Sequence, residues 1–117
     1  MNERIPRVNK LLKEEVGKIV LREVDLPENV LVTVTRAEAT LNLQQARIYI
    51  SVVPEDRVKE VLRVMNYSVF DVQQILNKKL RMRPVPRIEW VAETKTREAE
   101  KIEKLLSEIQ KKNYNKH

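Results

Sequence analysis

The sequence predicts a single α+β domain with a three-stranded sheet, in the chain order α-β-β-α-kink-α-β followed by a C-terminal helix. Apolar residues recur every three or four positions in the segments predicted as helices, and every second position in those predicted as strands. At 117 residues the chain has the length of one domain, and it contains no internal repeat and no interdomain linker. We therefore assign residues 1–112 to the domain and residues 113–117 to a polar C-terminal tail.

The first part of the chain predicts a helix followed by two strands. Between Ile5 and Val24 the apolar positions follow a helical period, and a proline occupies the first turn, where its missing N–H costs nothing. Residues 29–40 and 45–53 are rich in β-branched side chains and alternate apolar with polar positions, as strands do. Because only a short polar link separates these two strands, we expect them to pair antiparallel. The helix is expected to bury Ile5, Val8, Leu11, Leu12, Val16, Ile19 and Val20.

A second, longer helical pattern begins at Pro54, and its apolar stripe continues to Leu80. Ser68 and Asp71 have the spacing of a capping box, which marks the start of a helix. We therefore predict a helix kink or break at Ser68, with one uninterrupted helix as the alternative. We expect the helical region to stop at Arg83, because two prolines follow closely and cannot donate backbone hydrogen bonds.

The last two predicted elements are a strand and a helix. In residues 86–93, Ile88, Trp90 and Ala92 fall on one face of an alternating pattern, so Trp90 is expected in the core. The segment from Thr96 to Lys111 returns to helical spacing and predicts a C-terminal helix.

Composition argues against several classes of site. The chain has no cysteine, and its only histidine, His117, is the final residue, so neither a catalytic triad nor a histidine-bearing metal cluster is expected. Gly17 is the only glycine, which excludes a phosphate-binding glycine-rich loop and the GxxG loop of classical KH domains. The aromatic residues are scattered and no strand offers two exposed rings, so an RRM-type stacking platform is not expected. We expect no enzymatic activity, no cofactor and no metal.

The positive charge is modest overall but concentrated in one stretch. The net charge is +6, and the ten residues from Lys78 to Arg87 contain five cations and no acid. Cations in the last turns of a helix interact favourably with its dipole, which accounts for the first three but not for the two beyond the helix end. An anionic partner accounts for all five, namely Lys78, Lys79, Arg81, Arg83 and Arg87. The first helix carries a further set of cations, Arg4, Arg7 and Lys10. These residues either extend the same surface or form a solvated polar face.

Three blocks of the sequence resemble, in order and spacing, the bacterial ribosome-binding factor A family. They read PRVNKLLKEEVGKIVLREV, VTVTRAEATLNLQQARIYISVV and LRMRPVPRIEW, and the resemblance covers Arg4 to Leu106. In the middle block Leu43 and Ala46 match the family pattern directly. The third block matches at Arg81, Arg83, Val85 and Pro86.

The resemblance implies a KH-like domain of type II, in which a helix-kink-helix replaces the GxxG loop, and Ser68 stands where the family has an alanine. It also implies a non-catalytic assembly factor that binds the small (30S) ribosomal subunit and its precursor 16S rRNA late in maturation. The resemblance also implies a role in processing the 5′ end of that RNA and importance for growth in the cold. On this basis we expect the five clustered cations to contact phosphates, with the three on the first helix as secondary candidates.

Other expectations concern location and competing functions. Without a signal peptide or an apolar run of membrane-spanning length, we expect a cytoplasmic monomer with neither a membrane partner nor a small-molecule substrate. A general RNA- or DNA-binding protein is one alternative. A protein-interaction module is another, in which the C-terminal helix would pair with a partner helix through Ile102, Leu105, Leu106 and Ile109. A small hydrolase is the remote option.

Overall fold

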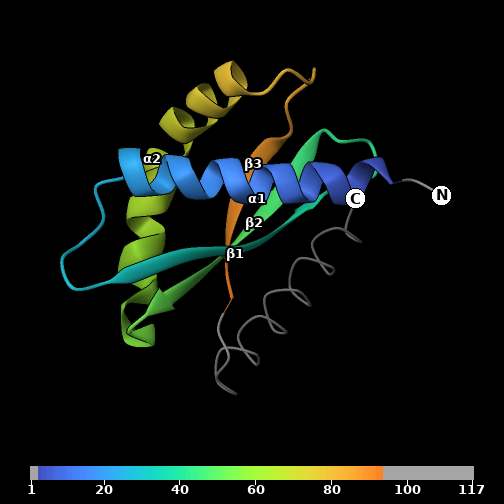
Figure 1. The fold of residues 1–117 in the computed structure, drawn as a ribbon. Coiled ribbons are helices and arrows are strands. Elements are labelled where there is room, and N and C mark those ends of the chain that lie inside the picture. Colours follow the sequence, from blue (N-terminus) through green and yellow to red (C-terminus); the bar gives the residue numbers. More distant parts are fainter. Residues whose placement is uncertain (1–2, 94–117) are drawn as a thin grey trace, which may run out of the picture.

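The computed structural model describes residues 3–93 and contains two long helices and three strands (Figure 1). In chain order the elements are α1 (Arg4–Glu23), β1 (Leu31–Ala39), β2 (Gln45–Val53), the short 3₁₀ turn η1 (Glu55–Arg57), α2 (Val58–Lys79) and β3 (Arg87–Ala92). The predicted C-terminal helix and the polar tail lie outside the described residues.

The three strands form one sheet in the order β1-β2-β3. β1 and β2 pair antiparallel, as expected, with Leu31 opposite Val53 and a register shift between Val34 and Arg36. β3 pairs parallel to β2, with Arg87 opposite Gln45. A parallel pair needs a long crossover connection, and α2 provides it.

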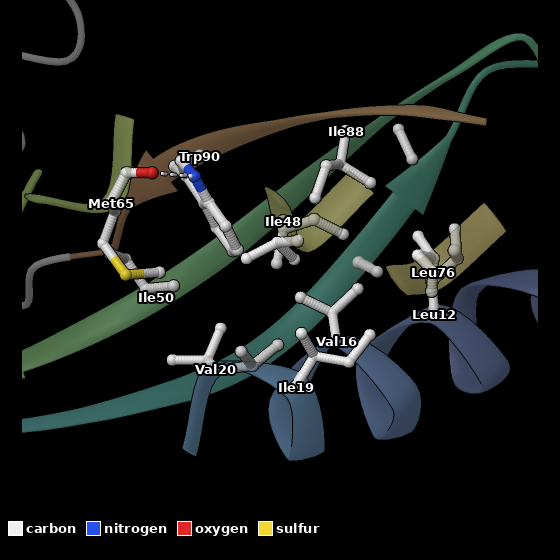
Figure 2. Close-up of a cluster of buried hydrophobic side chains, with 14 of the residues drawn as sticks. Leu12, Val16, Ile19, Val20, Ile48, Ile50, Met65, Leu76, Ile88 and Trp90 are labelled. Atoms are coloured by element: carbon white, nitrogen blue, oxygen red, sulfur yellow. Dashed lines mark hydrogen bonds between the residues drawn. The ribbon is translucent and has the colours of Figure 1, made fainter. Parts of the chain in front are cut away.

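Both helices cover the same face of the sheet. The side chains of β2 alternate between buried and solvent-facing positions, so the other face, which we call the open face, is left without a helix among the described residues. α1 packs mainly on β1, and α2 packs on β3 and on α1. The core between these layers contains, among others, Leu12, Val16 and Ile19 of α1, Ile48 and Ile50 of β2, Met65 and Leu76 of α2, and Ile88 and Trp90 of β3 (Figure 2).

The predicted buried stripe of α1 is confirmed for Val8, Leu12, Val16, Ile19 and Val20, whereas Ile5 is only partly buried and Leu11 is not buried. Leu11 of α1 is 38% exposed, because α1 turns only one side toward the sheet and neighbouring Leu12 is the residue that points inward. Trp90 is buried as predicted, and its indole Nε1 donates a hydrogen bond to the Met65 carbonyl at 2.9 Å (Figure 2). A buried indole N–H needs such a partner.

The predicted break at Ser68 is wrong, because α2 is one continuous helix of 22 residues that runs through this position. Within the described residues no hydrogen bond joins the Ser68 hydroxyl to Asp71, so the capping box does not form. The buried side chains Met65 and Val72 lie on one side of this single helix, and their packing outweighs the local capping signal. Figure 1 shows that the axis of α2 nevertheless changes direction between its green first half and its yellow second half. A kink at residue 68 itself stays a prediction.

The predicted end of the helical region is also wrong by four residues. α2 ends at Lys79 rather than at Arg83, and Leu80 already has an extended backbone with φ −85° and ψ 138°. Leu80 is buried, so its side chain anchors the chain to the core where it leaves the helix. Arg81 therefore lies in the connection to β3 and not in the last turn of the helix.

Candidate nucleic-acid interface

The five clustered cations lie on the last turn of α2, on the connection that follows it and at the first residue of β3. We call residues 78–87 the basic segment. All five cationic side chains are exposed. Within residues 3–93, no carboxylate forms an ion pair with any of them. Within this part of the chain, their charges are therefore not compensated by a carboxylate.

The basic segment is held in place at both ends. Leu80 N–H donates to the Leu76 carbonyl at 3.0 Å as the helix ends, and Arg87 N–H donates to the Gln44 carbonyl of the β1–β2 turn at 2.9 Å. Pro86, like Leu80, is buried. The cations are thus presented on an ordered backbone, which lowers the entropy lost when they bind a partner.

Gln73 of α2 fastens the far end of the basic segment. Its side-chain Nε2 donates to the Pro86 carbonyl at 3.0 Å, and its Oε1 accepts from the Ile88 N–H at 2.9 Å. Nε2 also donates to Asn77 Oδ1 at 3.0 Å, which fixes the orientation of the amide. The sequence analysis missed this residue, because a single glutamine on a helix carries no signal of a contact with a segment 13 to 15 residues away.

Arg83 differs from the other four cations. Its Nη1 donates to the Leu80 and Met82 carbonyls, each at 2.7 Å, so this guanidinium braces the basic segment itself. An arginine has five N–H donors, and within residues 3–93 the remaining donors of this exposed side chain make no hydrogen bond. Arg83 therefore combines a structural contact with an exposed charge, whereas Lys78, Lys79, Arg81 and Arg87 make no side-chain contact of this kind within residues 3–93.

The three secondary candidates lie at the start of α1, toward the same end of the molecule as the β1–β2 turn (Figure 1). Asn9 Oδ1 accepts a hydrogen bond from the Ala39 N–H at 2.7 Å, which ties this part of α1 to the end of β1. Arg4, Arg7 and Lys10 are all exposed, but they belong to another element than the basic segment. Arg7 also forms an ion pair with Glu3 at 3.8 Å, with both side chains more than 80% exposed, and such a pair is weak.

Two arginines on the open face have their charges compensated. Arg36 forms ion pairs with Glu38 and with Glu93, the latter at 3.0 Å, and its guanidinium lies 3.7 Å from the centre of the Tyr49 ring. Burial by itself would lower the pKa of Arg36, but its hydrogen bond to Glu93 and the nearby carboxylates outweigh burial, so the pKa is raised. Arg47 pairs with Glu89 at 3.3 Å. These two arginines are consequently weak candidates for phosphate contacts.

A pair of exposed aromatic side chains also escaped the sequence analysis. Tyr67 is 90% exposed and Phe70 is 68% exposed, both on the outer side of α2. The prediction that no stacking platform exists was based on strands, whereas these two rings lie one turn apart on a helix. Their spacing of three residues was the sequence signal that could have indicated this pair, because residues three apart are neighbours on the surface of a helix.

Other kinds of site find little support in residues 3–93. Two surface depressions border the β1–β2 turn, and the larger of this pair is lined by Thr40, Leu41, Asn42, Gln44 and Gln45. No group of three or more His, Cys, Asp or Glu side chains in the described part of the chain is placed to hold a metal ion. Neither described helix has the length and apolarity needed to cross a membrane.

Comparison with known proteins gives a consistent result. The sequence profile of the family described as ribosome-binding factor A matches residues 4–106. The ribosome-binding factor A of Chlamydia pneumoniae is 33% identical over 114 residues, which cover 95% of either chain. That of Thermodesulfovibrio yellowstonii is 31% identical over 109 residues, covering 93% of this chain and 92% of the relative.

Solved structures agree on the fold. The crystal structure of ribosome-binding factor A from Thermus thermophilus superposes with a TM-score of 0.63 at 19% identity, over 75% of this chain and 93% of that one. A Thermotoga maritima protein solved by NMR gives a TM-score of 0.57 at 23% identity, over 82% of this chain and 96% of that one. A third match is a homology model of the Thermus thermophilus factor, fitted into the cryo-EM map of its complex with the 30S subunit. It gives a TM-score of 0.55 at 21% identity, over 71% of this chain and 88% of that one.

Proposed function

Because this chain belongs to the ribosome-binding factor A family, we propose that it binds the small ribosomal subunit and its precursor 16S rRNA and acts in late maturation of that subunit. The observation that carries the proposal is the basic segment: five exposed cations, none in an ion pair within residues 3–93, on a backbone fastened by Gln73. Phosphate groups of RNA are the anions that such a cluster recognises best, through charge and through release of counterions.

The family supports the choice of partner. The related Thermus thermophilus factor has been fitted into the map of a complex with the 30S subunit. We assign the phosphate contacts to Lys78, Lys79, Arg81 and Arg87, with Arg83 contributing a contact while it braces the segment. Arg4, Arg7 and Lys10 would extend the surface toward the start of α1.

Finer parts of the proposal follow from family membership. They are a KH-like domain of type II, a role in 5′-end processing of the 16S rRNA, importance in the cold, and action as a cytoplasmic monomer without enzymatic activity or cofactor. The order of helices and strands in residues 3–93 is compatible with the KH-like assignment. A folded RNA would be recognised by shape and backbone more than by base sequence.

The test is a binding experiment with purified protein across a salt series. Isolated small subunits, mature and immature, are compared with large subunits and with a generic RNA duplex. Tighter binding to small subunits at physiological salt, and tighter still to immature ones, is the expected result. Equal binding to all four that disappears together as salt rises would leave only a general nucleic-acid-binding domain.

A further inference from the structure

Among residues 3–93, Tyr67 and Phe70 are the aromatic residues that the fold leaves largely exposed. Trp90 is buried and hydrogen-bonded to the Met65 carbonyl, and Tyr49 lies beneath Arg36 and donates from its hydroxyl to Glu38 at 3.2 Å. Tyr67 and Phe70 instead project from α2 into solvent, at 90% and 68% exposure. Leaving two large rings exposed forfeits the free energy of burying them, and adjacent apolar side chains on a surface commonly mark a binding site.

The surroundings of the two rings indicate the chemistry of the partner. Five exposed residues follow one another along α2 at intervals of three or four positions and therefore form a single stripe. They are Arg63, Tyr67, Phe70, Gln74 and Lys78. Arg63 lies about 6 Å before Tyr67 along the helix axis, and Lys78 about 12 Å beyond Phe70. Neither cation forms an ion pair within residues 3–93. One acid, Asp71, borders the stripe.

This stripe is continuous with the basic segment, because Lys78 belongs to both. Aromatic rings flanked by free cations are the combination that binds single-stranded nucleic acid, since bases stack on the rings while the cations hold the phosphates. An apolar partner protein would gain from the two rings but would have to desolvate Arg63 and Lys78 at the ends of the same stripe.

We propose that Tyr67 and Phe70 stack against unpaired bases of an RNA strand whose phosphates lie on Arg63, Lys78 and the rest of the basic segment. The proposal rests on the function inferred above, since RNA is the partner assigned there. It divides the interface into two parts: the basic segment supplies charge without regard to strandedness, whereas the aromatic pair gives a preference for single strands over duplexes.

The experiment uses the full chain, a single-stranded RNA of about 12 nucleotides, which is within the site size of single-strand binders, and an RNA duplex of equal length. The double variant Tyr67→Ala/Phe70→Ala is expected to lose about tenfold to hundredfold in affinity for the single strand, with the salt dependence unchanged and duplex affinity retained. The swap Tyr67→Phe/Phe70→Tyr, which keeps both rings, should restore binding. Leu21→Ala is the matched control, because Leu21 is a 75% exposed apolar residue on α1.

Several results would overturn the proposal. The double alanine variant could bind the single strand as tightly as the unmodified chain does. The unmodified chain could show no detectable single-strand binding, or Leu21→Ala could lose as much affinity as the double alanine variant. A loss of binding to small subunits without any loss on protein-free RNA would assign the rings to a ribosomal protein instead. If the unmodified chain shows no preference for small subunits while the double variant still loses single-strand affinity, the ribosomal assignment fails and the stacking surface stands.

Discussion

The arginines of the open face and those of the basic segment differ in what surrounds them. On the open face, Arg36 is paired with Glu38 and Glu93 and lies over Tyr49, and Arg47 is paired with Glu89. In the basic segment, Arg81 and Arg87 have no carboxylate partner within residues 3–93. All of these arginines carry the same charge and are exposed, so composition alone does not distinguish a binding arginine from a structural one. The difference lies in whether another part of the fold has already supplied the anion.

The largest expected effect comes from removing two unpaired arginines. Arg81→Ala/Arg87→Ala should reduce RNA affinity about tenfold to hundredfold at low salt, and each lost phosphate contact should lower the slope of log affinity against log salt by about 0.7 to 0.9. The matched control is Arg36→Ala/Arg47→Ala, which removes the same charge from the open face. The measurement is RNA binding from about 50 to 200 mM salt. If both double variants lose affinity equally, only net charge matters and the comparison between the two regions is invalid.

A second variant tests whether the order of the basic segment matters. Gln73→Leu removes the hydrogen bonds to Pro86 and Ile88 and should lower the free energy of unfolding by about 1 to 2 kcal/mol. RNA affinity should fall because the basic segment is no longer held in place. The slope of log affinity against log salt should stay the same, because Arg81 and Arg87 remain. Chemical denaturation and RNA binding measure the two effects. Gln74→Leu, a change at the exposed neighbouring position, should leave stability nearly unchanged; an equal loss there would contradict the role of Gln73.

A smaller effect is expected on the open face. Arg36→Ala removes two ion pairs and the contact with Tyr49, and it should cost about 0.5 to 1 kcal/mol of stability, because exposed ion pairs and cation–π contacts are individually weak. RNA affinity should not change. Arg81→Ala should show the opposite behaviour, with weaker RNA binding and a stability change within about 0.5 kcal/mol. Thermal unfolding of both variants measures the stability change. Equal losses of stability in the two variants would contradict the structural role assigned to Arg36.

The smallest effect is expected at Ser68, which lies in the middle of α2, the helix that ends in the basic segment. In a continuous helix Ser68→Ala should be neutral or stabilise by a few tenths of a kcal/mol, whereas removal of a true helix cap would cost about 1 kcal/mol. Chemical denaturation distinguishes these values. A loss near the larger figure would show that serine caps a second helix in solution and that α2 is divided there.

Most of the fold was predictable because it depends on local periodicity. The bounds of α1 and β2, the antiparallel pairing of β1 with β2 and the burial of Trp90 agree with the sequence analysis. The errors lie where local and tertiary signals compete. The capping pattern at Ser68 indicated a break, but packing of Met65 and Val72 keeps one helix. The prolines indicated an end at Arg83, but α2 ends at Lys79, and Leu80 is buried in an extended conformation.

The candidate site was predictable in position but not in organisation. The concentration of cations in residues 78–87 is visible without a structure. That Arg83 braces the segment and that Gln73 fastens it could not be inferred from spacing. The pair Tyr67 and Phe70 had a readable spacing, but whether these rings are buried or exposed depends on the direction in which α2 faces the sheet.

The amino-acid sequence by itself determined which segments form helices and strands and where positive charge accumulates without acids nearby, because these properties depend on residues close together in the chain. The tertiary structure alone decided which charges are neutralised. Arg36 and Glu93 are 57 positions apart and Arg47 and Glu89 are 42 apart, and only the folded sheet brings these oppositely charged groups into contact. Within residues 3–93 no such partner reaches Lys78, Lys79, Arg81 or Arg87, and for this reason we propose that an external anion binds them.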